Sequence, residues 1–459
     1  MGRLGPVRAY RELRQEFDRA IFVLAAGDLV ASFGFSLIFP FLTIFLVSNL
    51  GASATEAGLV LGAYSICSIF SNAAGGWLAD RFGRKIVMTV SITLTAIVVA
   101  LMGQVSDLRA VGALTMVLGL VDPPFIPAAR AAVADVVPEE KRPRAYSLLT
   151  VAASVGWIAG PAIGAGLAVL GYSFLFFISG VILAGYTFIL IFGFRETKPE
   201  AGTAGIRAAA TGSGGPGSSG GGRPATEVVP IDPDALYAGL GQAARARVTL
   251  DAADPALARR IFLAFLPVCV VIHAVSFQWV ATLPIHANRD LGVSTTTWGL
   301  LFAFNGILIV LFQLRVTSST ERMLKPRAMA LGLLAYGLAY LAIAPVVGPE
   351  GAVPALALAV ILATVGEMLV YPYEASFVAD LSPVAVRGRY QGMLGAAVGL
   401  GSAVGPPVGG LMLDLAPGAP TWIAVSAAAA VAAGGLWVLG NPVRRLLARQ
   451  EATAVEVPA

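Results

Sequence analysis

The sequence predicts an all-α integral membrane protein whose twelve transmembrane helices form two pseudo-symmetric six-helix bundles. Three observations favour this class. First, 57% of the 459 residues are hydrophobic and only 13% are charged, whereas soluble domains carry roughly 25% charged residues. Second, apolar stretches long enough to cross ~30 Å of hydrocarbon recur along almost the whole chain. Third, the second half of the sequence repeats features of the first.

The apolar stretches are expected to be helices. In hydrocarbon every backbone amide needs a partner inside the protein, and the strands of a transmembrane barrel are about half as long and alternate in polarity. The expected helices cover approximately residues 20–48, 56–78, 86–105, 111–134, 146–170, 173–194, 261–284, 296–316, 328–347, 353–379, 390–413 and 420–440.

The loops between these helices predict the orientation in the membrane. The first stretch contains Asp28 and Pro40 and has no small-residue cleavage site, so we expect a membrane helix and not a signal peptide. One set of alternate loops offers only Arg109 and Arg289, so the positive-inside rule predicts a multi-pass plasma (inner) membrane protein with both termini in the cytoplasm. The other set holds Arg81, Arg84, Lys85, Lys141, Arg142, Arg144, Arg322, Lys325, Arg327, Arg387 and Arg389.

Several classes of function are not expected. The net charge of +4 reflects the loop bias and gives no reason to expect a nucleic-acid partner. Cys67 and Cys269 both lie in apolar stretches, so no disulfide is expected. The sequence has no His-Glu-x-x-His, no Gly-x-Ser-x-Gly and no metal-spaced Cys/His cluster, so we expect no enzyme, metal site or cofactor.

A segment rich in Gly, Ala, Ser and Pro divides the chain. Residues 195–258 carry too little apolar surface to fold and are expected to form a flexible cytoplasmic linker. A phosphate-binding loop is not expected here, because no Gly-Lys-Ser/Thr follows the glycines. The linker separates an N-terminal bundle, residues 1–194, from a C-terminal bundle with a short cytoplasmic tail, residues 259–459.

The two halves repeat each other, which indicates duplication. Both copies enter from the same side, so we expect parallel repeats with a binding site near the midplane between two bundles. An earlier set of equivalents pairs Leu50, Gly51 and Gly58 with Leu291, Gly292 and Gly299. A later set, 245 residues apart, pairs Asp135, Pro138, Arg142, Arg144, Gly156, Gly160, Pro161 and Gly164 with Asp380, Pro383, Arg387, Arg389, Gly401, Gly405, Pro406 and Gly409.

The loop after the second stretch carries the most specific motif. Residues 76–85 read Gly-Trp-Leu-Ala-Asp-Arg-Phe-Gly-Arg-Lys, which resembles the cytoplasmic loop motif of the major facilitator superfamily, G-x-x-x-D-R-x-G-R-K. The resemblance implies that Asp80 approaches the start of the eleventh helix, where a negative charge is favourable by ~0.3–1 kcal/mol. The residues expected to form this conformational gate are Gly76, Asp80, Arg81, Gly83, Arg84 and Lys85.

The fifth stretch carries a second motif, made of Gly156, Gly160, Pro161 and Gly164. It resembles the motif of the antiporter branch of the same superfamily, with Ala165 in place of the usual second glycine. A purely structural interpretation also holds, because small residues allow close helix packing and proline bends a helix. The whole chain outside the linker resembles twelve-helix multidrug:proton antiporters, although the arginine that these proteins carry near the position of Thr115 is missing.

Three acids lie within apolar stretches: Asp28, Asp122 and Glu367. A charge at mid-bilayer costs about 2.5–3.5 kcal/mol on the insertion scale, so these side chains need partners or water. Asp122 and Glu367 are equivalent in the two halves and are expected beside a central cavity, where low dielectric brings carboxyl proton exchange towards neutral pH. Each acid has a structural alternative: a hydrogen bond for Glu367 and Asp122, and an ion pair with a loop residue for Asp28.

Other side chains are weaker candidates for the cavity. Arg130 is interpreted either as a structural partner of an acid or as a substrate contact. His273 is interpreted either as a proton relay or as a packed, hydrogen-bonded residue. Phe277, Trp279 and Tyr371 suit cation–π contacts with flat cations, although ordinary packing explains them equally well.

These observations predict a secondary active transporter that exports amphipathic or cationic small molecules in exchange for protons by alternating access. The expected partners are the small-molecule substrate, protons and the lipid bilayer, with the proton gradient as energy source and a monomer as the working unit. Uptake or flipping of a nutrient or lipid on the same fold is the alternative transport function. A membrane-embedded enzyme or sensor is the alternative from another class.

Overall fold

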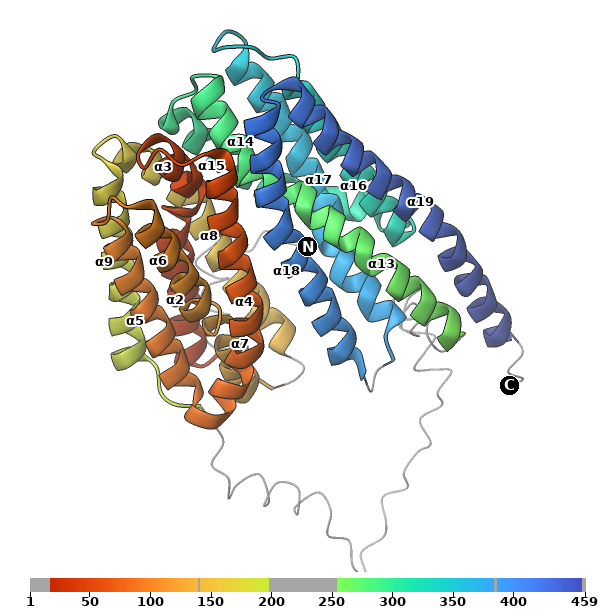
Figure 1. Cartoon of the computed structure of the whole chain (residues 1–459). Helices are drawn as coiled ribbons and strands as arrows, with labels where there is room; N and C mark the ends of the chain where they lie inside the picture. Colours follow the sequence, from red (N-terminus) through yellow and green to blue (C-terminus); the bar gives the residue numbers. More distant parts are fainter. Residues whose placement is uncertain (1–16, 139–140, 198–253, 384–385, 456–459) are drawn as a thin grey trace, which may run out of the picture.

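The computed structural model describes residues 17–138, 141–197, 254–383 and 386–455, so most of the expected linker lies outside the described residues. Within these ranges, twelve continuous or broken helices are long and apolar enough to cross a membrane. The predicted fold class, with two six-helix bundles, is confirmed (Figure 1). The first half contains α2 (Arg19–Ser36), η1 (Phe39–Phe41), α3 (Leu42–Ser48), α4 (Ala54–Phe82), α5 (Arg84–Met102), α6 (Leu108–Val121), α7 (Phe125–Val136), α8 (Arg142–Ala168) and α9 (Tyr172–Gly193).

The second half repeats this order, with its own breaks. Its last helix continues well beyond the predicted end at residue 440, because the polar residues that follow extend the helix past its apolar part. The elements are α13 (Pro255–Ser276), η4 (Phe277–Trp279), α14 (Thr282–Ile285), η5 (His286–Asp290), α15 (Thr295–Thr320), α16 (Lys325–Ile343), α17 (Ala352–Leu381), α18 (Arg387–Leu415) and α19 (Ala419–Val455).

The fourth membrane span is broken at two consecutive prolines, which separate α6 from α7. Pro124 cannot donate to the carbonyl of Leu120, four residues earlier. The hydroxyl of Ser71 donates to this carbonyl instead, and the hydroxyl of Ser91 donates to the carbonyl of Val121. The break is therefore satisfied by side chains of α4 and α5, as a membrane interior requires.

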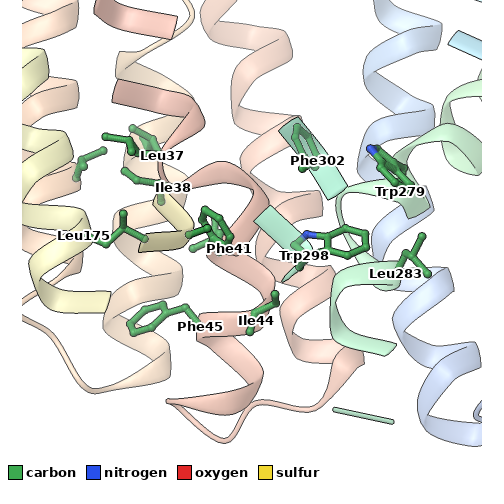
Figure 2. Packing of buried hydrophobic residues seen from close by; sticks show 14 of the residues in the cluster. Leu37, Ile38, Phe41, Ile44, Phe45, Leu175, Trp279, Leu283, Trp298 and Phe302 are labelled. Atoms are coloured by element: carbon green, nitrogen blue, oxygen red, sulfur yellow. The ribbon is translucent and has the colours of Figure 1, made fainter. Parts of the chain in front are cut away.

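The two halves are packed together at one end and diverge at the end that bears the basic loops (Figure 1). At the closed end a single buried apolar cluster contains residues of both halves. Figure 2 shows Phe41 of the first half in this cluster near Trp298 and Phe302 of the second half. A separate buried cluster lies entirely within the second half. The structure is thus a pair of bundles that pack against each other at one end only.

Equivalent glycines seal the closed end at two equivalent crossings. A Cβ atom added to Gly58 of α4 would lie 2.9 Å from Cα of Pro407 in α18. A Cβ atom added to Gly299 of α15 would lie 2.7 Å from the carbonyl oxygen of Pro161 in α8. Contacts this short leave no room for a side chain, so the repeated glycines and the repeated Gly-Pro motifs pack against one another across the halves.

Candidate functional site

A cavity of about 840 Å³ lies in the first half, among α2, α4, α6, α7 and α8. Its charged lining residues are Asp28, Asp122 and Arg130. Its aromatic lining residues are Phe35, Tyr64, Phe125, Tyr146 and Trp157. A cavity of this size, mostly apolar with a few charged groups, is typical of a small-molecule site.

Helical periodicity explains how α2 contributes to the cavity. Asp28, Ala31, Ser32 and Phe35 all line it, and their spacing of three, four and seven residues places them on one face of the helix. The carboxylate and the phenyl ring are therefore presented together, two turns apart.

The two acids of the cavity are available to bind a ligand. Among the described residues, the side-chain carboxylates of Asp28 and Asp122 form no hydrogen bond and no close ion pair, although the backbone carbonyl of Asp122 accepts a hydrogen bond from the hydroxyl of Ser91 at 3.1 Å. Arg130 lines the same cavity, and its backbone carbonyl accepts a hydrogen bond of 3.0 Å from the hydroxyl of Tyr146. Two carboxylates face one guanidinium, so the ionised cavity carries a net negative charge that suits a cation or a proton.

Two aromatic residues of the cavity wall, Phe35 and Trp157, belong to a group of three packed rings. The rings of Phe35 and Phe39 are stacked at 5.3 Å, and both meet the ring of Trp157 edge to face at 6.1 and 6.2 Å. Such faces beside carboxylates favour flat apolar cations through cation–π contact. Sequence reasoning missed Phe35, Tyr64, Tyr146 and Trp157, although the helical spacing from Asp28 to Phe35 was a usable signal.

Glu367 has a different environment from its equivalent, Asp122. Its Oε2 accepts a hydrogen bond of 3.0 Å from Nδ2 of Asn305, which also donates to the hydroxyl of Thr364 at 2.9 Å. Asn305 lines a second cavity of about 250 Å³ between α8 and α15, which shares Trp157 with the larger one. The structure therefore does not bring the two equivalent acids to one common cavity wall.

The aromatic and histidine candidates of the second half lie outside the lining of both cavities. Trp279 is buried and packs against Trp298 and Phe302. Phe277 begins the short turn η4 beside it. Tyr371 is 44% exposed, and its ring stacks on that of His273 at 5.9 Å.

Thr115 lies near the position where the sequence analysis notes a missing arginine. Its hydroxyl is buried and donates to the carbonyl of Val111 at 2.8 Å. The positive charge of the cavity comes instead from Arg130, about four turns further along the chain in α7. The double-proline break between α6 and α7 lies between these two positions.

The loop motif is organised around Arg84 at the end that bears the basic loops. The side chain of Arg84 is 11% exposed, and its Nε lies 2.9 Å from Oδ2 of Asp135. Asp80, by contrast, is 73% exposed and pairs with Arg84 at 3.1 Å. Glu196 accepts hydrogen bonds from the backbone amides of Arg84 at 2.9 Å and Lys85 at 3.1 Å, which caps the start of α5.

The second half has the counterpart of this ion pair, since Lys325 lies 2.5 Å from Asp380. All of these contacts of Asp80 and Arg84 stay within the first half. The predicted approach of Asp80 to the start of the eleventh helix therefore does not occur in this conformation, where the bundles diverge at that end (Figure 1).

Gly83, between α4 and α5, has φ +103°, which glycine alone adopts without strain.

Gly75 and Gly76 offer a matched test of which glycine supports the fold. A Cβ atom on Gly75 would lie 2.7 Å from Cα of Pro124 and 2.8 Å from Cγ of Pro127, whereas one on Gly76 would meet nothing within 4 Å. We expect Gly75→Val to destabilise the protein by about 1–3 kcal/mol through overpacking, and Gly76→Val to leave stability unchanged. Thermal unfolding of both variants in detergent is the measurement; equal melting temperatures contradict this assignment.

The glycines of the antiporter-like motif face the first helix. Cβ atoms on Gly156 and Gly164 would lie 2.6 Å from the carbonyl oxygen of Leu29 and 2.9 Å from that of Leu37, respectively. Gly160 would meet the hydroxyl of Ser36, which donates to the carbonyl of Gly156 at 3.0 Å. The motif thus allows α8 to pack backbone to backbone against α2, while Pro161 forms the crossing with α15 described above.

A further acid joins the halves at the closed end. Asp414, at the end of α18, accepts hydrogen bonds from the backbone amides of Ala54 and Thr55 at 3.1 and 2.8 Å and from the hydroxyl of Thr55 at 2.7 Å. It also pairs with Arg289 at 3.2 Å. Asp414 therefore caps the start of α4 across the boundary between the halves. No sequence motif marked this residue.

Comparisons with known proteins identify the family. The family model for the Major Facilitator Superfamily matches residues 24–373 and 268–458. The uncharacterized MFS-type transporter YttB of Bacillus subtilis is 28% identical over 403 residues, which cover 86% of this chain and 89% of YttB. The chain belongs to the major facilitator superfamily of transporters.

Two groups of relatives carry names of drug resistance. The multidrug resistance protein MdtG of Yersinia enterocolitica is 37% identical over 190 residues, 39% of this chain and 44% of MdtG. The quinolone resistance protein NorA of Staphylococcus aureus is 25% identical over 195 residues, 40% of this chain and 50% of NorA.

Solved structures share the fold at low sequence identity. A peptide transporter POT in complex with sulfate matches with a TM-score of 0.71 at 16% identity, over 95% of this chain and 99% of that chain. The nucleoside transporter NupG matches with a TM-score of 0.66 at 16% identity, over 92% and 98%. At this identity the likeness concerns the fold alone.

Proposed function

We propose that this protein exports amphipathic cations in exchange for protons by alternating access. The observation that carries the proposal is the cavity of the first half, where the unpaired carboxylates of Asp28 and Asp122 lie beside the aromatic rings of Phe35 and Trp157. The named resistance functions of MdtG and NorA agree with such a substrate.

The chemistry follows from competition for the same carboxylates. In a cavity of low dielectric, a carboxylate without a partner holds either a proton or a cation, because leaving it charged and bare is costly. A cationic substrate that enters therefore releases protons from Asp28 and Asp122. When the cavity faces the opposite side, protons replace the substrate, and the gradient drives net export.

The geometry agrees with one end of this proposed cycle. The halves are sealed by the glycine crossings and by Asp414, and they diverge at the end with the basic loops. If that end is cytoplasmic, as the positive-inside rule predicts, the cavity faces inward and is ready to accept substrate from the cytoplasm or the inner leaflet. Closure there would bring Asp80 towards the start of α18.

Transport of a cationic dye into inverted vesicles with an acidic lumen tests the proposal. We expect accumulation that collapses when nigericin in potassium medium removes the pH gradient, since that treatment leaves the membrane potential intact. Vesicles without the protein are the control. Accumulation that persists undiminished after nigericin and valinomycin together have removed both the pH gradient and the membrane potential rejects proton coupling. Accumulation of a nutrient or lipid in place of the dye favours the alternative cargo.

A further inference from the structure

A cluster of three metal-ligating side chains lies inside the second half, apart from both cavities. Cys269 and His273 are one turn apart on α13, and Glu374 comes from α17. Sγ of Cys269 lies 2.8 Å from Oε1 of Glu374, and Nε2 of His273 lies 3.1 and 3.0 Å from the two carboxylate oxygens. The ligand atoms all lie within 4.8 Å of one another. One thiol, one imidazole and one carboxylate therefore converge on a single point.

The cluster is shielded from solvent. Cys269 is fully buried, and His273 and Glu374 are each 6% exposed. Cys269 belongs to the apolar cluster that is confined to the second half. Within the part of the chain that the structure describes, the hydrogen bonds and ion pairs of Glu374 are those with the thiol and the imidazole. This carboxylate has no lysine or arginine partner there to balance its charge.

The internal repeat relates this cluster to the cavity of the first half. Ser32 and His273 occupy equivalent positions, because each lies against the equivalent motif glycine of α8 or α18. One turn earlier, Cys269 is therefore the equivalent of Asp28. Where the first half presents an unpaired acid to a cavity, the second half holds a thiol in a closed three-residue cluster. The two halves have diverged at this position towards different ligands.

We propose that Cys269, His273 and Glu374 bind a divalent transition metal ion of the zinc class. A mixed set of sulfur, nitrogen and oxygen ligands suits zinc and does not suit magnesium or calcium. A dication bound by a thiolate, a carboxylate and a neutral imidazole sums to zero charge, which a buried apolar site tolerates. Sequence analysis did not identify this site, because the third ligand, Glu374, lies 105 residues after Cys269.

The ligand distances require only a small adjustment. In a tetrahedral zinc site with bonds of about 2.0–2.3 Å, neighbouring ligand atoms are about 3.3–3.7 Å apart. The hydrogen-bonded atoms need to separate by roughly half an ångström, and Sγ of Cys269 and Nε2 of His273, which lie within 4.8 Å of each other, need to reach the same spacing. With three protein ligands, a fourth position stays open for water. The ion ties α13 to α17 within one bundle, so its role is to stabilise the second half and to fix His273 and the Tyr371 ring stacked on it.

Cobalt titration tests the site directly. The purified full-length protein, with any affinity tag removed and resident metal stripped by a chelator, is titrated with Co²⁺. We expect one equivalent to bind with a thiolate-to-cobalt charge-transfer band in the near ultraviolet and the visible bands of tetrahedral cobalt. Zn²⁺ should displace the cobalt and raise the melting temperature.

The matched variants are Cys269→Ser and Cys67→Ser, since Cys67 is the other cysteine and lies in α4 of the first half. Cys67→Ser should keep the charge-transfer band. Cys269→Ser should lose the band and bind Co²⁺ at least tenfold more weakly. Absence of the band in the parent protein overturns the proposal even if a variant fails to fold. A band that persists in Cys269→Ser also overturns it. Neither result bears on proton-coupled transport, because both are measured without a gradient.

Discussion

Asp122→Asn and Asp28→Asn should each reduce pH-gradient-driven transport of a cationic dye at least tenfold. Asparagine keeps the size of the side chain but can neither release a proton nor balance a cation. Both carboxylates line the cavity without a hydrogen bond or close ion pair among the described residues, so their replacement breaks no such contact. A tenfold lower rate corresponds to an increase of about 1.4 kcal/mol in the activation free energy of transport. Initial rates in inverted vesicles are the measurement.

The control for these variants is Glu350→Gln, an acid on an exposed loop between α16 and α17. It should transport at the parental rate. If Asp122 couples protons, its replacement should lower the rate of dye counterflow, which needs no proton movement, less than the rate of gradient-driven transport. Parental gradient-driven rates in both cavity variants would exclude these acids from the coupling.

Asp414→Ala should open the closed end of the molecule. The carboxylate joins α18 to the first turn of α4 through two backbone amides and one hydroxyl, and it also holds Arg289. Charge-assisted hydrogen bonds of this kind are strong, but the side chain is 23% exposed and solvent weakens them. We expect a shift of about 1–3 kcal/mol, or ~5–150-fold, towards the conformation that is open at this end.

Spin-label distances measure this shift. Labels at exposed Asn49 and Val347, in a Cys67→Ser background, report the separation of the halves at the closed end in lipid nanodiscs. The control is Asp107→Ala, because Asp107 caps α6 at the same end but within one half, through the amide of Ala110. Asp414→Ala should lengthen the distance and Asp107→Ala should not. An unchanged distance in Asp414→Ala would show that the glycine crossings and the shared apolar cluster hold the end closed without Asp414.

The placement of the acids separates what a linear pattern can predict from what it cannot. Asp28 and Asp122 were identified as costly charges in apolar stretches, and the structure lines one cavity with both. Equivalence in the repeat also predicted a shared cavity for Asp122 and Glu367. That expectation does not describe this conformation, because Glu367 accepts a hydrogen bond from Asn305, which lines the smaller cavity, whereas Asp122 lines the larger one.

Aromatic candidates show the same limit. The sequence singled out Phe277, Trp279 and Tyr371 near His273, but the cavity is lined by Phe35, Tyr64, Tyr146 and Trp157. A hydrophobic ring satisfies a core position, a lipid-facing position and a cavity wall equally well, so its residue type carries little information. Which rings face the cavity depends on how α2, α4 and α8 rotate against one another.

The sequence by itself determined the class, the number of spans and the family, because solvation in lipid acts on every residue of a stretch and duplication leaves the same residues at a fixed spacing. It also marked the glycines and prolines of the two halves as equivalent. Only the tertiary structure decided what those residues touch: that Gly58 and Gly299 cross the Gly-Pro motifs of the opposite half, that Asp414 caps α4, and that Cys269 meets Glu374. The physical reason is the separation along the chain over which each effect acts. Burial and periodicity are local along the chain, whereas each of these contacts joins residues more than one hundred positions apart through the packing of separate helices.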